Sequence, residues 1–164
     1  MMRAALLTLG LALVAAGAGA EHTMPMPAAQ IGVVLGRKAG PAVRALNLRS
    51  GWIAAAPPGA EELAAYVTLS NPGPSGVTLV GASCPLAGEA TFMLSGRDAG
   101  GREDMRAAGR LPVPAGGSLT LAPGKGHIML RALKRQPRPG ELVGLTLRFS
   151  DGSALSLRLP VRRL

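Results

Sequence analysis

After the first twenty residues, methionine and histidine occur in only two parts of the sequence. One group is close to the N-terminus and the other lies in the second half: His22, Met24 and Met26, then Met93, Met105, His127 and Met129. Both histidines stand two residues before a methionine. Thioether sulfur and imidazole nitrogen suit Cu(I), and a neutral thioether needs no deprotonation to bind. The pattern indicates a soft-metal site, with copper as the leading candidate.

The tripeptide His127-Ile128-Met129 has the spacing of a strand that carries ligands on one face. Side chains at positions i and i+2 of a strand project to the same side, about 6.5 Å apart at a rise of ~3.3 Å per residue. We therefore expect His127 and Met129 to converge on one ion while Ile128 faces the core. Met93 and Met105 lie in two other segments, so only the fold could bring them to this pair.

The first group lies in a segment that we interpret as a flexible tail, from Glu21 to about Gln30. If cleavage precedes Glu21, a free amine, the following amide and the imidazole of His22 could chelate Cu(II), while Met24 and Met26 would favour Cu(I). The alternative is an unstructured tail whose side chains are incidental.

The first twenty residues have the three parts of a secretory signal. Arg3 supplies the charged start, an apolar run follows, and small residues end at Ala20. The run is too short and too rich in Ala and Gly for a membrane span. We expect a protein without stable membrane insertion, exported to the periplasm. Its single cysteine, Cys84, lies far from the cleavage site, where lipoprotein acylation would need one, and is interpreted as a small buried residue.

From Ala45 onward, short apolar runs with period-two alternation are separated by Gly and Pro. This spacing is typical of many short strands joined by turns. It predicts an all-β, single-domain Greek-key β-sandwich over residues 45–164. Residues 1–20 are expected to be the signal peptide, and 21–44 a flexible tail and linker, in which Ile31 to Leu35 could form a short strand or continue the tail.

The composition argues against several functions. A net charge of +9 could attract nucleic acid, but export and the scarcity of aromatic residues disfavour that partner. The charge is dispersed, so we read it as a solvated surface, with an acidic docking partner as the alternative. An electron-transfer cupredoxin needs a thiolate and two histidines, and a hydrolase needs acid-base groups. One histidine after residue 44 serves neither, so we expect no enzyme.

Several segments together resemble the PCuAC family of periplasmic copper chaperones, which have a cupredoxin-like β-sandwich. The family carries a His or Met, a Met about ten residues later, and His-x-Met after 21 more residues, which Met105, His127 and Met129 match. Met93 takes the first place, one residue farther away than usual. Further similarity lies in Tyr66-Val67-Thr68-Leu69-Ser70-Asn71-Pro72-Gly73 and Val113-Pro114-Ala115-Gly116-Gly117.

The resemblance implies a Cu(I) chaperone that helps to load the CuA centre of cytochrome c oxidase subunit II, or that supplies a second copper chaperone. Its mechanism would be ligand exchange, and Arg106 could steer an acidic acceptor. Because Met93 replaces the more usual histidine, the alternative is a non-catalytic exported β-sandwich interaction module with weak or lost copper binding.

Overall fold

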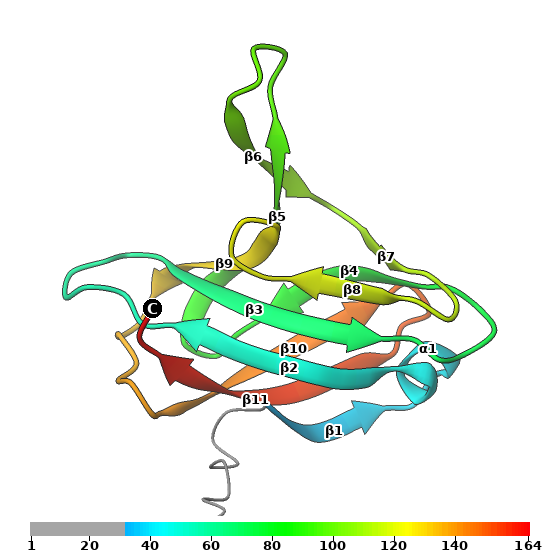
Figure 1. The fold of residues 1–164 in the computed structure, drawn as a ribbon. Coiled ribbons are helices and arrows are strands. Elements are labelled where there is room, and N and C mark those ends of the chain that lie inside the picture. The colour runs from blue at the N-terminus through cyan, green and yellow to red at the C-terminus, as the bar shows by residue number, and fades with distance from the viewer. Residues whose placement is uncertain (1–31) are drawn as a thin grey trace, which may run out of the picture.

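The period-two segments form eleven strands in the computed structural model, which describes residues 32–164 (Figure 1). The elements in chain order are β1 (Val33–Lys38), α1 (Pro41–Ala45), β2 (Asn47–Ala54), β3 (Leu63–Ser70), β4 (Val77–Ser83), β5 (Ala87–Arg97), β6 (Glu103–Ala108), β7 (Leu111–Val113), β8 (Ser118–Leu121), β9 (Gly126–Leu133), β10 (Leu142–Phe149) and β11 (Ala154–Arg162). The signal peptide and the His22, Met24 and Met26 group lie outside the described residues.

The strands form two packed layers joined through β11. One layer has the order β1-β11-β10-β4-β7, and the other has β6-β5-β9-β3-β2, with β8 also paired to β3. β11 is antiparallel to β10, and its last residues pair in parallel with β2, where Val161 faces Ile53. The apolar sides of both layers face one another, and side chains such as Leu69, Leu147 and Leu157 are buried between them. The predicted all-β sandwich is confirmed.

The ordered domain begins earlier than the sequence indicates. β1 pairs with β11, and α1 brings Val43 against the core, where only 1% of its surface is exposed. Asp151 accepts a hydrogen bond from the Ala42 backbone at 3.0 Å, and the Arg37 guanidinium donates one to the Val43 carbonyl at 2.7 Å. Residues 33–44 therefore belong to the sandwich, unlike the flexible linker expected there, because β1 pairs with β11 and the side chains of Ala42 and Val43 are buried.

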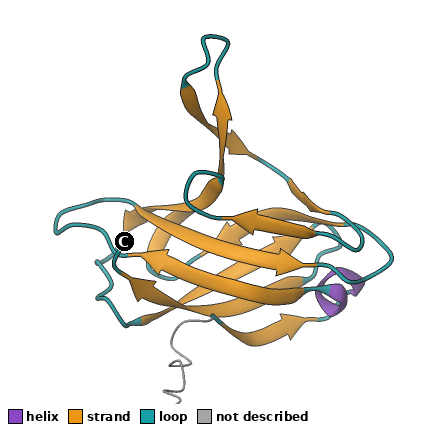
Figure 2. Cartoon of the chain, viewed as in Figure 1, coloured by secondary structure: helices purple, strands orange, loops and turns teal. Residues whose placement is uncertain are grey.

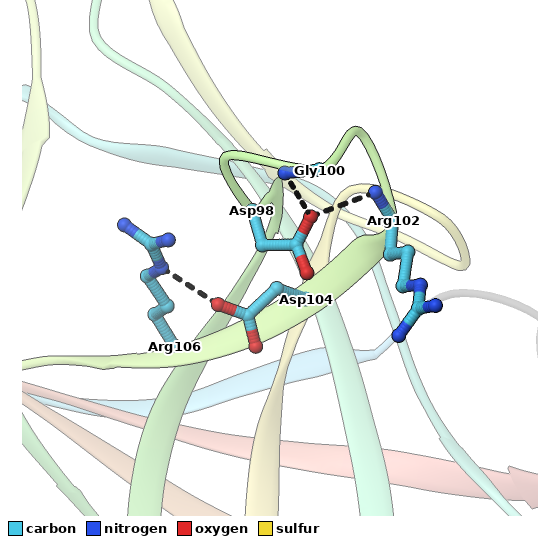
Figure 3. A network of polar contacts seen from close by, with 5 residues as sticks. All are labelled: Asp98, Gly100, Arg102, Asp104 and Arg106. Atoms are coloured by element: carbon cyan, nitrogen blue, oxygen red, sulfur yellow. Dashed lines mark hydrogen bonds and ion pairs between the residues drawn. The ribbon is translucent and has the colours of Figure 1, made fainter.

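The β5–β6 hairpin projects beyond the body of the sandwich, as the strand cartoon in Figure 2 shows. Its tip is tied by Asp98, whose Oδ1 accepts hydrogen bonds from the backbones of Gly100 and Arg102, each at 2.9 Å (Figure 3). Gly101 has a φ of +79°, a left-handed conformation in which glycine carries no steric penalty. This local network gives the hairpin a defined turn. No helix within residues 32–164 is long and apolar enough to cross a membrane.

Candidate metal centre

On strand β9, His127 and Met129 point away from the core, as the period-two alternation of the sequence predicts. Ile128 and Leu130 are fully buried, whereas His127 and Met129 are half-buried on the opposite face of the strand. β9 lies between β3 and β5, so both neighbours supply side chains to the same outer face. The imidazole and the thioether therefore lie on the central strand of this face.

Strand β5 places Met93 directly opposite His127. The neighbouring Phe92 faces Ile128 and is buried in the core, which leaves the half-buried Met93 on the outer face. Directly opposite residues in an antiparallel pair have Cβ atoms about 4.5–5.5 Å apart. One ion could therefore contact both side chains without a change in the backbone. The irregular sequence spacing of Met93 does not move it away from the site.

Strand β6 adds the fourth side chain. Met105 faces Ser95, which lies two residues beyond Met93 on the same face of β5. The Ser95 hydroxyl donates a hydrogen bond to the Met105 sulfur at 3.1 Å. Met105 is 39% exposed, the most accessible member of the set. Three strands thus bring Met93, Met105, His127 and Met129 to one surface.

Aromatic side chains extend from His127 across the sheet. The Tyr66 ring meets the imidazole edge-on, with the ring centroids 6.2 Å apart and the planes at 64°. The Trp52 ring lies against the Tyr66 ring, with their centroids 4.6 Å apart. The Arg162 guanidinium lies 5.9 Å from the Trp52 ring centroid. Partial burial lowers the pKa of His127, while the Glu62 carboxylate opposes this effect. The imidazole is therefore neutral at pH 7, the form that binds metal.

A shallow hollow opens beside the imidazole because a small residue, Ala64, faces Met129 across the strands. Its volume is about 190 Å³, and Glu62, His127 and Met129 contribute to its wall. Glu62 pairs with Arg131 at 2.8 Å, which holds its carboxylate at the rim. An incoming side chain could reach His127 and Met129 through this opening.

Comparisons with known proteins identify the family. A family model described as "Putative lipoprotein LpqE-like" matches residues 46–161. The chain is a PCuAC-type member of the LpqE-like family. The "Putative lipoprotein Lxx21020" of Leifsonia xyli subsp. xyli is 33% identical over 117 residues, which cover 71% of this chain and 69% of that protein.

Solved structures share the fold of this PCuAC-type domain. Apo-DR1885 from Deinococcus radiodurans is 32% identical with a TM-score of 0.60, and the match covers 100% of this chain and 97% of that chain. Its CuI form is 37% identical with a TM-score of 0.56, over 69% and 75% of the two chains. The apo PCuAC domain from PmoF1 is 20% identical with a TM-score of 0.64, over 73% and 95%.

The four side chains on this face of the PCuAC-type domain would have a definite chemical preference as ligands. Three thioethers and one neutral imidazole would form a soft, uncharged donor set that fits Cu(I) better than Zn²⁺ or Mg²⁺. Within residues 32–164, no three side chains among His, Cys, Asp and Glu gather around a common point. Cys84 is buried, and burial raises the pKa of its thiol, in agreement with its interpretation as a small core residue.

Two further residues of the PCuAC-type site were not predicted from the sequence. Ser95 contacts Met105, and Tyr66 contacts His127. Ser95 lies at i+2 from Met93, so a shared face could have been inferred once β5 was assigned as a strand. The contact of Tyr66 could not, because it depends on β3 being the neighbour of β9.

Proposed function

We propose that this protein is a copper chaperone that binds Cu(I) through Met93, Met105, His127 and Met129 and delivers it without covalent chemistry. The observation that carries the proposal is the strand register, which sets Met93 opposite His127 and Met129 on the same outer face. The relative DR1885 has a solved structure in its CuI form and is 37% identical over 69% of this chain, which adds support for the metal.

Transfer by ligand exchange follows from the exposure of these side chains. All four reach the surface, and the hollow beside His127 and Met129 admits a further ligand. A thiolate or imidazole of the acceptor can bind the copper before the donor's ligands leave. Met105 is the most exposed, and its sulfur is the one that the Ser95 hydroxyl can hold after release. The ion therefore remains coordinated throughout the exchange.

We propose the CuA centre of cytochrome c oxidase subunit II, or a second copper chaperone, as the acceptor. The support is the PCuAC membership of the chain, and the expected location is the periplasm. Arg106, which we considered as a steering group for an acidic acceptor, forms an ion pair with Asp104 at 2.8 Å. Steering by Arg106 would therefore require this surface pair to open.

The N-terminal residues His22, Met24 and Met26 form the second proposed place for copper. The support is their composition, which combines a histidine and two methionines within five residues. His22 next to a free terminal amine would bind Cu(II), and the thioethers would bind Cu(I). Removing residues 21–26 should abolish the Cu(II) signal while Cu(I) binding by the domain persists.

The decisive experiment is a Cu(I) titration of the mature chain against a competing chromophoric chelator. His127→Ala and Met129→Leu should each weaken binding at least about tenfold, which is ~1.4 kcal/mol. Lys125→Ala is the matched control, because Lys125 is an exposed residue directly before β9. Equal weak binding by all four proteins would refute the chaperone function and favour an interaction module.

A further inference from the structure

Strand β6 leaves one of its edges open beside the proposed copper site. In the described part of the chain it ends the sheet and pairs only with β5. The hairpin that carries it projects clear of the sandwich (Figure 1). Four of its six residues are exposed, and Met105 lies near its middle. An open strand edge can accept another strand through its backbone.

The backbone groups of Met105 point toward that open edge. The Ser95 N–H donates to the Lys125 carbonyl at 3.0 Å, so the backbone of Ser95 is directed away from β6. Alternate residues of a strand direct their backbone groups to opposite neighbours. Leu94 therefore faces β6, where its partner is Arg106. The next residue, Met105, must direct its N–H and carbonyl outward.

The charged side chains on either side of Met105 would be complementary across a pair of β6 strands from two copies. If two β6 strands pair antiparallel with Met105 opposite Met105, then Asp104 of each copy faces Arg106 of the other. Opposite charges across an antiparallel pair stabilise it. The two groups already attract each other within one chain (Figure 3), and both are substantially exposed. They are therefore accessible to a second copy.

We propose that two copies of this protein pair through their β6 edges, centred on Met105, so that each copy presents its Met105 thioether beside the copper site of the other. The inference rests on the proposed function, because the shared thioethers give copper a route between copies. A six-residue edge buries much less area than a stable interface. The pairing is consequently weak in the metal-free protein, and Cu(I) strengthens it by bridging the two chains.

Charge-reversal variants test this register, with self-association measured by sedimentation velocity. The measurements use about 0.15 M salt, where long-range repulsion is screened. The Cu(I)-loaded wild type should dimerise reversibly. Asp104→Arg and Arg106→Asp should each weaken association about tenfold, because each creates like-charged pairs across the two-fold axis. A 1:1 mixture of the two variants should recover association, as should the doubly exchanged chain.

Two controls separate the edge contact from net charge and from the metal. Glu103→Arg changes the charge as much as Asp104→Arg, but Glu103 would face Ala107 of the second copy, so its association should match that of the wild type. Met105→Leu keeps the edge and should lose the strengthening by Cu(I). The pairing is overturned if the loaded wild type stays monomeric, if the mixture does not recover, or if Glu103→Arg weakens association as much as Asp104→Arg.

The same samples distinguish this inference from the proposed function. Cu(I) affinity is measured on dilute chains, where dimers are absent. Normal affinity without association would refute the pairing alone. Loss of Cu(I) binding in the dilute wild type would refute the chaperone function, and with it the reason for copper to strengthen the dimer.

Discussion

Replacing Met93 with leucine tests whether the thioether across from the histidine binds copper. Leucine has a similar volume, and Met93 is only half-buried, so the free energy of unfolding should change by less than about 1.5 kcal/mol. The sulfur, in contrast, is one of the four proposed donors on the face. Met93 lies directly opposite His127, so the substitution would remove a proposed donor beside the imidazole.

We expect Met93→Leu to weaken Cu(I) binding by about ten- to a hundredfold, or ~1.4–2.8 kcal/mol. The assay is competition with a chromophoric Cu(I) chelator at pH 7, together with thermal unfolding of the metal-free protein. Thr91→Val is the matched control, because Thr91 lies on the same face of β5, opposite Met129, and has no sulfur. Its affinity should equal that of the wild type.

Met93→His gives a second test of the same position. A histidine restores a donor, so Cu(I) binding should recover relative to Met93→Leu. Histidine binds metal only when deprotonated, and the recovered affinity should therefore fall more steeply below pH 6 than that of the wild type. If Met93→Leu binds as tightly as the wild type while His127→Ala does not, Met93 is not a ligand and our interpretation of the register is wrong.

Three other predictions concern the groups that support the site and the fold. Ser95→Ala should strengthen Cu(I) binding by about two- to fivefold in the same competition assay, because the metal-free protein loses the hydrogen bond that holds the Met105 sulfur. Gly126→Ala should destabilise the protein by about 1–3 kcal/mol in denaturant unfolding, since the new Cβ would lie 2.6 Å from the Met93 carbonyl oxygen. Arg135 lowers the Glu141 pKa from 4.5 to about 2, so the small stability advantage of the wild type over Glu141→Gln should be complete above pH 4.5. It should disappear as the pH falls toward 2, and equal differences at pH 6 and pH 2 would contradict this assignment.

The faces of individual strands could be predicted from the sequence because they depend only on local geometry. His127 and Met129 alternate with Ile128 and Leu130, and burial follows that alternation. The same rule predicts that Phe92 and Met93 take opposite faces. The rule cannot say whether Phe92 or Met93 points into the core, because that depends on how β5 pairs with β9.

The parts that could not be predicted depend on contacts between distant segments. The short run at the start of β1 carries no clear alternation, and its strand conformation is stabilised by pairing with β11. The hydrogen bond from Ser95 to Met105 requires the exact register of a hairpin whose turn is set by Asp98. Ligation by Met93, Met105, His127 and Met129, and copper capture by the N-terminal group, remain predictions.

The row of rings beside the imidazole would give the proposed copper site an optical reporter. Trp52 is the only tryptophan in the chain, and it touches Tyr66, which in turn touches His127. Its emission therefore arises from one place, two ring contacts from the proposed ion. Because the Arg162 guanidinium lies near the same indole, the emission also senses the end of β11. Loading, release and handover of copper could be followed in real time without attaching a dye.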